Sequence, residues 1–216
     1  FCSLRSSVPQ IATIHDLNFE QYPKDLPWLV SRYFRFFFPK FAQKAKRILT
    51  VSNFSKADIV QTYGISNNKI SVVYNGISDE FRVSTSEEIT ETRGQFSNGK
   101  PYFLFVGSLH PRKNVQRLVQ AFAKFSLENS EIDLVIVGNA MWKQEVFQLT
   151  NETKKRVHFL GHLTTNELSR VTGAAFALSY VPYFEGFGIP LVEAMRCGIP
   201  IVSANTSCLP EIAGDA

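Results

Sequence analysis

Short apolar runs alternate along this chain with longer segments in which apolar residues recur every three or four positions. The runs are typical of buried β-strands, and the longer segments are typical of amphipathic helices. Strands that alternate with helices pair in parallel, so the pattern predicts an α/β fold built on parallel sheets. The expected strands are 11–14, 47–51, 70–74, 102–106, 132–137, 157–160, 174–179 and 199–203, and the expected helices are 27–46, 53–63, 87–93, 114–126, 141–150, 165–172 and 189–197.

The composition is that of a folded globular chain. Of the 216 residues, 44% are hydrophobic and 19% are charged, which is enough apolar material for a core and argues against disorder. The net charge of +4 comes without a nucleic-acid-binding motif, so we expect no nucleic-acid partner. Cys2, Cys197 and Cys208 lack metal-binding spacing and fit a reducing cytoplasm, and the four histidines form no metal pattern either.

Two carboxylates frame a glycine-rich turn in the stretch Glu185–Pro200, EGFGIPLVEAMRCGIP. Gly186 and Gly188 permit backbone conformations that other residues avoid, and Pro190 suits the first turn of a helix. The free N–H groups and the dipole at that helix start would bind an anion at the end of the preceding strand. Helical side chains lean toward the N-terminus, so Glu193 would reach a ligand there. A Gly-Phe-Gly turn alone favours the alternative, an ordinary strand–turn–helix with two solvated glutamates.

A second strand, loop and helix precede this stretch. The apolar run Tyr102–Val106 leads into Gly107-Ser108-Leu109-His110-Pro111-Arg112-Lys113-Asn114, after which helical spacing begins. Adjacent cations at a helix start oppose the helix dipole, and that cost makes sense where a diphosphate lies between them. Arginine offers a fork to phosphate oxygens, and lysine offers a point charge. A solvated basic turn is the alternative.

A His-Asp pair follows the first expected strand. The carboxyl ends of parallel strands are where α/β proteins bind ligands, so His15 is a candidate site residue. The pair taken alone favours a local cap or hydrogen bond.

The segment Arg32–Arg47, RYFRFFFPKFAQKAKR, is basic and aromatic and contains no acid. Aromatic side chains with cations suit the edge of an anionic membrane. A helix whose phenylalanines pack on the sheet while its lysines stay exposed explains the same pattern. We favour this second interpretation because a helix has to cover the sheet, and peripheral membrane contact through Arg32–Arg47 is the alternative.

These motifs together resemble the retaining glycosyltransferases of family 4. The signature of that family is a glutamate, seven residues and a second glutamate, written around GFG-x-P-x-x-E-A-M-x-x-G-x-P-V, and its phosphate loop has the pattern G-S-x-x-x-R-K-N. The chain matches the signature at Glu185, Gly186, Phe187, Gly188, Pro190, Glu193, Ala194, Met195, Gly198 and Pro200, with Ile201 where valine is frequent, and the loop at Gly107, Ser108, Arg112, Lys113 and Asn114. His15-Asp16-Leu17 is similar to the family's first-domain histidine segment. Thr50–Lys56 and Val72–Ile77 are similar too, and we expect them to act mainly as scaffold.

The resemblance implies that a sugar passes from a nucleotide diphosphate sugar to a hydroxyl acceptor with retention of anomeric configuration. It implies that His15 and Glu185 are catalytic, and that Arg112, Lys113, Gly107 and Ser108 bind the donor diphosphate. No metal and no further cofactor would then be needed, because fixed cations stabilise the leaving group. The residues expected at the donor sugar and ribose are Glu185, Gly186, Phe187, Gly188, Ile189 and Glu193, and those expected at the nucleobase are Phe159, Gly161 and Leu163.

The fold that the resemblance implies is GT-B, with two Rossmann-like domains that are both incomplete in this chain. Residues 1–80 would be the C-terminal half of the acceptor domain, 81–100 the linker region and 101–216 most of the donor domain, because a full domain of this kind needs roughly 150 residues. We expect a cytoplasmic enzyme of cell-surface polysaccharide or lipopolysaccharide synthesis that uses a nucleotide-sugar donor and a saccharide or lipid-linked acceptor. The alternatives are a nucleotide-binding GT-B module without catalysis and a GT-B phosphorylase, for which no clear pyridoxal phosphate lysine is visible.

Overall fold

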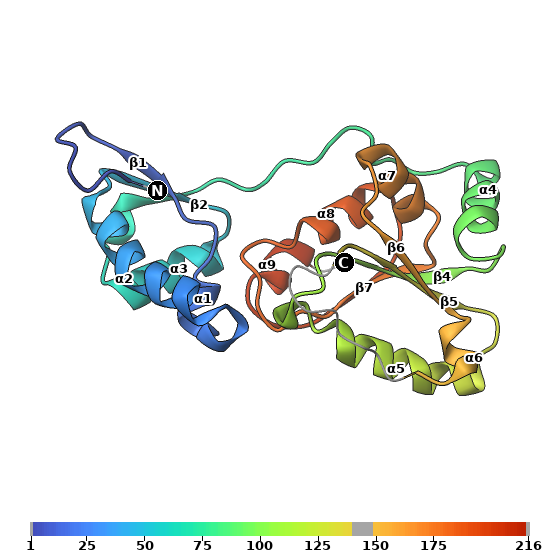
Figure 1. Cartoon of the computed structure of the whole chain (residues 1–216). Coiled ribbons are helices and arrows are strands. Elements are labelled where there is room, and N and C mark those ends of the chain that lie inside the picture. Colours follow the sequence, from blue (N-terminus) through green and yellow to red (C-terminus); the bar gives the residue numbers. More distant parts are fainter. Residues whose placement is uncertain (1, 140–148, 215–216) are drawn as a thin grey trace. The chain divides into compact units, whose positions relative to one another are not determined.

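The computed structural model describes residues 2–139 and 149–214, and it divides them into two compact units (Figure 1). Unit 1 comprises the residues up to Gly76 together with Phe184–Gly188 and Thr206–Gly214. Unit 2 comprises Ile77–Tyr183 and Ile189–Asn205. Each unit is built on a parallel sheet, so the expected α/β fold is confirmed.

Unit 1 has a three-stranded parallel sheet in the order β1-β2-β3, and Ile48 of the central strand lies beside Ala12 on one side and Ile70 on the other. The strands are β1 (Ile11–Thr13), β2 (Arg47–Thr50) and β3 (Ile70–Val72). The helices are α1 (Asn18–Gln21), α2 (Trp28–Lys44), α3 (Asn53–Tyr63) and α9 (Leu209–Ala213), with the single 3-10 turns η1 (Pro23–Asp25) and η2 (Asn67–Lys69).

The core of unit 1 is formed by the sheet and by the inner face of α2. The strand residues Ala12, Ile48 and Ile70 are almost completely buried, and α2 adds Phe41 and Ala42. Three more phenylalanines of α2 pack against this core: Phe34, Phe37 and Phe38. The expectation that phenylalanines of this segment pack on the sheet is therefore confirmed.

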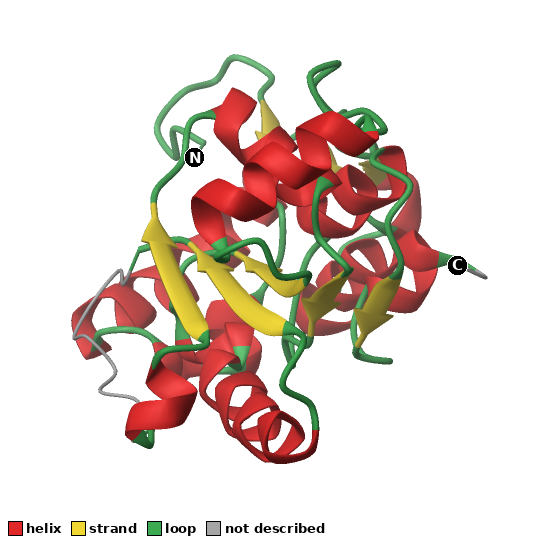
Figure 2. Cartoon of the chain, turned by 90° about the vertical axis from the view of Figure 1, so that its right-hand side faces the viewer, coloured by secondary structure: helices red, strands yellow, loops and turns green. Residues whose placement is uncertain are grey.

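Unit 2 has a five-stranded parallel sheet in the order β6-β5-β4-β7-β8, with helices on both faces (Figures 1 and 2). The strands are β4 (Tyr102–Val106), β5 (Asp133–Val137), β6 (Val157–Gly161), β7 (Ala177–Tyr180) and β8 (Ile201–Ser203). The helices are α4 (Ser86–Phe96), α5 (Val115–Glu128), α6 (Asn151–Lys154), α7 (Thr165–Gly173) and α8 (Ile189–Arg196), with the 3-10 turn η3 (Pro111–Lys113). In Figure 1, α5 and α6 lie below this sheet, and α7 and α8 lie above it. The central strand β4 is buried on both sides, which explains its continuous apolar sequence.

Most expected helices and strands lie within a few residues of the observed ones. The expected helices do not include α1, α6, α9 or the 3-10 turns, because segments this short show no period. The expected helix at 141–150 falls almost entirely in residues 140–148, outside the described part of the chain. Helix α4 is longer than the expected 87–93, and a capping box starts it: the Glu88 N–H donates to Thr85 Oγ1 at 3.3 Å, and the Thr85 N–H donates to Glu88 Oε2 at 2.8 Å.

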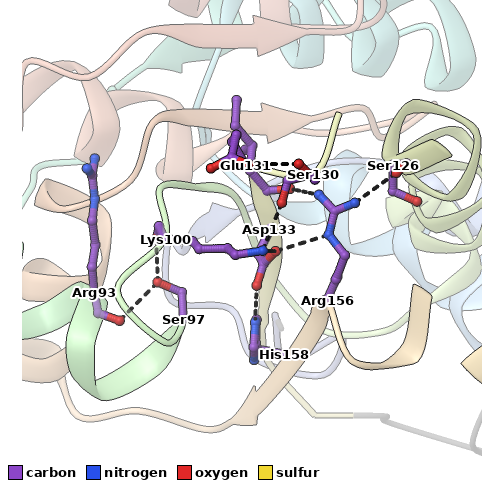
Figure 3. Close-up of polar contacts among 10 residues, drawn as sticks. Arg93, Ser97, Lys100, Ser126, Ser130, Glu131, Asp133, Arg156 and His158 are labelled. Carbon is purple, nitrogen blue, oxygen red and sulfur yellow. Dashed lines mark hydrogen bonds and ion pairs between the residues drawn. The ribbon is translucent and has the colours of Figure 1, made fainter. Parts of the chain in front are cut away.

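A polar network joins the amino ends of β5 and β6 (Figure 3). Its centre is the buried carboxylate of Asp133, which lies 2.8 Å from His158 Nε2, accepts from Arg156 Nε at 3.2 Å and lies 3.9 Å from Lys100 Nζ. Arg156 also donates to the Ser126 carbonyl at 2.8 Å, which ties α5 to the same edge. Ligands of parallel sheets bind at the carboxyl ends, so this network supports the fold on the edge away from the expected site.

Within residues 2–139 and 149–214, none of the helices is long and apolar enough to cross a membrane.

Candidate functional site

Three glycines join the carboxyl ends of β4, β5 and β6 in unit 2. The Gly107 N–H donates to the Val137 carbonyl at 2.9 Å, and the Gly138 N–H donates to the Gly161 carbonyl at 2.7 Å. All three glycines have positive φ, at 150° for Gly107, 135° for Gly138 and 66° for Gly161. A Cβ on Gly138 would lie 1.9 Å from the Gly107 carbonyl oxygen. Gly107 and Gly161, both expected at the site, thus lie on nearby strand ends, and Gly138 was missed by sequence reasoning.

The two adjacent cations lie in η3 and not at the start of a helix. Arg112 and Lys113 complete this 3-10 turn, and α5 begins only at Val115. Asn114 separates the two elements because its backbone takes the left-handed conformation, φ 60° and ψ 27°, which asparagine tolerates better than most residues. Its side-chain amide donates to the Val181 carbonyl at 3.0 Å. Helix α5 thus begins one residue after the expected start at 114, and both cations lie on the 3-10 turn that precedes it.

Two further hydrogen bonds tie η3 to the residues around the end of β7. The Tyr183 N–H donates to the Arg112 carbonyl at 3.0 Å, and Lys113 Nζ donates to the Tyr180 hydroxyl at 2.7 Å. Lys113 is only 8% exposed, and Tyr180 is fully buried. Lysine is rarely this buried without partners, so the alternative of a solvated basic turn is wrong for Lys113. Tyr180 was not among the expected site residues, and its sequence signal is weak: it follows Ser179 at the end of a short strand that is otherwise apolar.

Glu193 lies in the second turn of α8, and Gly188, with φ 90°, precedes the helix. The carboxyl group of Glu193 is partly buried, and burial raises its pKa from 4.5 to about 7. A carboxyl group with this pKa both donates and accepts hydrogen bonds near neutral pH, which suits the recognition of hydroxyl groups. Glu193 is thus not the solvated glutamate of the alternative interpretation.

Within unit 1, two hydroxyl groups at the start of α3 hold the Gly-Phe-Gly turn. Ser52 Oγ donates to the Gly186 carbonyl at 2.6 Å, and Ser55 Oγ donates to the same oxygen at 3.3 Å. A Cβ on Gly186 would lie 2.7 Å from the His15 carbonyl oxygen. Gly186 is therefore needed for close approach and not for a positive φ, which corrects the expectation, whereas Gly188 does have a positive φ. The structure brings the predicted site residues His15 and Gly186 together.

Glu185 is buried, at 5% exposure, so the solvated alternative is wrong for this glutamate as well. Its N–H donates to Ser207 Oγ at 3.1 Å. Burial raises the pKa of the nearby Cys208 thiol to about 12, and the charge of Glu185 adds to the effect. A buried carboxylate is costly, and groups of this kind concentrate at functional sites.

The carboxylate of Glu211 accepts hydrogen bonds from backbone N–H groups at the N-terminus of α3, beside the Gly-Phe-Gly turn. Its Oε1 accepts from the Asn53 N–H at 2.7 Å and from the Tyr74 hydroxyl at 2.8 Å. Burial acts to raise the pKa of Glu211, but the hydrogen bonds from the backbone and from Tyr74 outweigh it and leave the pKa below its ordinary value. The ring of Tyr74 lies 5.8 Å from that of Phe187. The two segments expected mainly as scaffold thus support the Gly-Phe-Gly turn.

The residues expected at the nucleobase are less closely grouped. Phe159 lies in the middle of the edge strand β6 and is 47% exposed, whereas Gly161 ends that strand and Leu163 follows it. The nucleobase role of these three residues stays a prediction.

In the part of the chain that the structure describes, no three His, Cys, Asp or Glu side chains group in a way that could hold a metal ion. Metal independence stays a prediction too.

The chain is similar to bacterial sugar transferases along nearly its whole length. It is 29% identical over 211 residues to O-antigen chain mannosyltransferase B of Escherichia coli, covering 95% of this chain and 55% of that protein. It is 29% identical over 217 residues to O-antigen chain mannosyltransferase RfbU of Salmonella typhimurium, covering 98% of this chain and 57% of that protein. The chain therefore spans about half the length of these curated relatives.

Solved structures show the same fold. HepE of Anabaena in complex with UDP and glucose superposes with a TM-score of 0.79 at 22% identity, covering 94% of this chain and 55% of that one. WaaG, a glycosyltransferase involved in lipopolysaccharide biosynthesis, superposes with a TM-score of 0.76 at 22% identity, covering 96% of this chain and 60% of that one. The fold is thus that of GT-B glycosyltransferases.

The family model for glycosyl transferases group 1 matches residues 86–216, and the model for glycosyltransferase family 4 matches residues 1–81. The chain belongs to the glycosyl transferases group 1 family.

Proposed function

We propose that the protein is a retaining glycosyltransferase that moves a hexosyl group from a nucleotide diphosphate sugar to a saccharide or lipid-linked hydroxyl in cell-surface polysaccharide synthesis. The observation that carries the proposal is the buried cation of Lys113, which follows Arg112 on a turn joined to the end of β7. A turn of this kind offers fixed positive charge where α/β proteins bind ligands. Mannose is the first sugar to test, because two curated relatives are named O-antigen chain mannosyltransferases.

In the proposed reaction, the bond between the anomeric carbon and the diphosphate oxygen breaks, and the acceptor oxygen bonds to the anomeric carbon from the same face. The acceptor's hydroxyl proton leaves with the diphosphate. Arg112 and Lys113 stabilise the negative charge that grows on the leaving diphosphate, so no metal ion is required. Glu193 binds the ribose hydroxyls, Glu185 binds the sugar hydroxyls, and His15 contacts the sugar near the reacting carbon.

A calorimetric panel of nucleoside diphosphates and nucleotide sugars, followed by an assay of transfer to oligosaccharide acceptors, tests this proposal. Selective binding of one nucleotide sugar, with product of retained configuration in excess chelator, is the expected result. Nucleotide binding without any transfer would favour a regulatory module. An absorbance band of pyridoxal phosphate in the purified protein would favour a phosphorylase.

We propose a cytoplasmic location, which the three buried free cysteines support.

We also propose that the outer face of α2 contacts an anionic membrane. Leu29, Tyr33 and Phe36 recur at helical spacing and are 71%, 46% and 57% exposed. The exposed cations Arg32 and Lys40 belong to the same helix, and Lys40 Nζ lies 3.3 Å from the centroid of the Phe36 ring. Aromatic rings flanked by cations, on a helix without an acid, fit the headgroup region of anionic lipid.

Flotation with lipid vesicles tests this contact. The protein should float with vesicles of phosphatidylcholine and phosphatidylglycerol, float poorly with phosphatidylcholine alone, and detach as salt is added. Tyr33→Ser combined with Phe36→Ser should abolish flotation. Leu127→Ser, at an 80% exposed apolar residue of α5, is the matched control and should float like the wild type. Flotation that is equal in all three proteins, or absent in the wild type, contradicts the contact.

A further inference from the structure

Tyr180 stands out among the residues around η3 because it is fully buried and yet receives a hydrogen bond from a cation. Lys113 Nζ lies 2.7 Å from the Tyr180 hydroxyl oxygen and 5.2 Å from the centroid of the Tyr180 ring. The ring itself is fixed, since it stacks on Phe105 of the central strand with centroids 6.4 Å apart and planes at 24°. Tyr180 is therefore a rigid acceptor beside a flexible side chain.

The methylene groups of the Lys113 side chain also pack against the backbone at Gly107. A Cβ on Gly107 would lie 3.5 Å from Lys113 Cε and 3.7 Å from Lys113 Cδ, so the methylene groups pack directly beside this backbone. The stem lies beside Gly107, and the ammonium group meets the end of β7. Two strands of one sheet thus fix the position of the cation.

The chemical nature of the Tyr180 hydroxyl, as a hydrogen-bond acceptor for Lys113, matters as much as its position. A lysine ammonium group on a four-carbon stem has many rotamers, and a fixed hydrogen-bond acceptor selects one of them. A carboxylate in the position of the Tyr180 hydroxyl would neutralise the ammonium charge. A neutral phenol orients the ammonium group without neutralising its positive charge.

We propose that Tyr180 is a positioning residue that holds Lys113 in the conformation that binds the donor diphosphate. Tyr180 acts through Lys113 and does not itself touch the donor. The inference rests on the proposed function, because it names a further residue for the same diphosphate site.

Tyr180→Phe tests the inference, because it removes the hydroxyl and keeps the ring that packs on Phe105. The matched control is Tyr102→Phe on the neighbouring strand β4, where a fully buried tyrosine donates to the Val171 carbonyl at 2.6 Å. Tyr180→Phe should weaken nucleoside diphosphate binding about tenfold and leave nucleoside binding unchanged. Tyr102→Phe should change neither affinity. Melting curves confirm that both variants are folded.

A double-mutant cycle separates positioning from a general structural effect. In a Lys113→Met background, Tyr180→Phe should cause no further loss of nucleoside diphosphate affinity, because both changes remove the same contact. Acetylation of lysines, read by mass spectrometry without any nucleotide, gives a second measurement. Lys113 should be labelled faster in Tyr180→Phe than in Tyr102→Phe, because its ammonium group has lost the hydrogen bond to the Tyr180 hydroxyl.

Additive losses in the cycle, equal weakening of nucleoside and nucleoside diphosphate, or unchanged labelling of Lys113 would each overturn the inference. The labelling result also separates it from the proposed function. If Lys113 labelling rises in Tyr180→Phe while the wild type binds no nucleoside diphosphate, the contact holds Lys113 but the diphosphate role is wrong.

Discussion

Gly138 approaches Gly107 so closely that a Cβ on Gly138 would lie 1.9 Å from the Gly107 carbonyl oxygen. The contact lies where β4 and β5 end. The Gly107 N–H also donates to the carbonyl of Val137, the residue before Gly138. The loop that carries Ser108 and η3 therefore starts from a point fixed by a neighbouring strand. A residue far from any recognised motif thus controls where the expected phosphate loop lies.

Gly138→Ala should displace this loop, destabilise the protein and weaken nucleoside diphosphate binding. The matched control is Gly99→Ala, since Gly99 also has a positive φ, 83°, but a Cβ there would meet no atom within 4 Å. The control should cost only the strain of a left-handed alanine, about 1–2 kcal/mol. Urea unfolding measures both variants, and equal losses of stability with equal nucleotide affinity would contradict the assigned role of Gly138.

The raised pKa of Glu193 predicts a pH dependence of nucleoside binding. The ionised carboxylate is the better acceptor for ribose hydroxyls, and burial holds the pKa near 7, so affinity should rise as the pH increases through about 7. A nucleoside is the right ligand, because it has no phosphate that titrates in this range. Glu193→Gln should bind more weakly and should show no such rise, and an identical pH profile in wild type and variant would contradict the assignment.

Ser52 both caps α3 and holds the Gly186 carbonyl, so Ser52→Ala should cost more stability than the loss of a cap alone. Its hydroxyl accepts from the Ser55 N–H at 3.0 Å and donates to Gly186 at 2.6 Å. Loss of a cap costs about 1 kcal/mol, and the second bond should add a similar amount. Thr85→Ala, which removes the cap of α4, is the control for chemical denaturation. The dual role of Ser52 is wrong if Ser52→Ala and Thr85→Ala lower the free energy of unfolding by the same amount.

Asp133→Asn should destabilise unit 2 without weakening nucleotide binding. The substitution leaves the part-buried Arg156 without its carboxylate, and breaking a buried ion pair of this kind costs about 3 kcal/mol. The network lies at the amino ends of the strands, away from Gly107. Thermal unfolding and calorimetry measure the two effects, and a loss of nucleotide affinity in the folded variant would contradict the separation of fold and site.

The elements that could be predicted from sequence are those with a local cause. Residues 102–106 are apolar without interruption because β4 is central and buried on both faces, and residues 53–63 form a helix that Ser52 caps. The turn η3 could not be predicted, because it depends on the left-handed backbone of Asn114 and on hydrogen bonds to residues after β7.

The missed site residues share one property, which is that their partners are distant in sequence. Tyr180 meets Lys113 across 67 residues, and Ser52 meets Gly186 across 134. A single sequence gives no sign of such pairs. Gly186 illustrates the limit, because its glycine was expected for a special backbone angle and is required by the nearby His15 carbonyl.

The most direct test of the account is calorimetry with Arg112→Ala and Lys113→Ala, using a nucleoside and the matching nucleoside diphosphate. Each substitution should weaken diphosphate binding by about 1.5–3 kcal/mol, the value of a charge-assisted hydrogen bond, and leave nucleoside binding unchanged. Arg117→Ala removes the same charge from an exposed position on α5 and should change neither affinity. Equal weakening of nucleoside and nucleoside diphosphate by the η3 substitutions, or an equal effect of Arg117→Ala, would contradict the proposed diphosphate site.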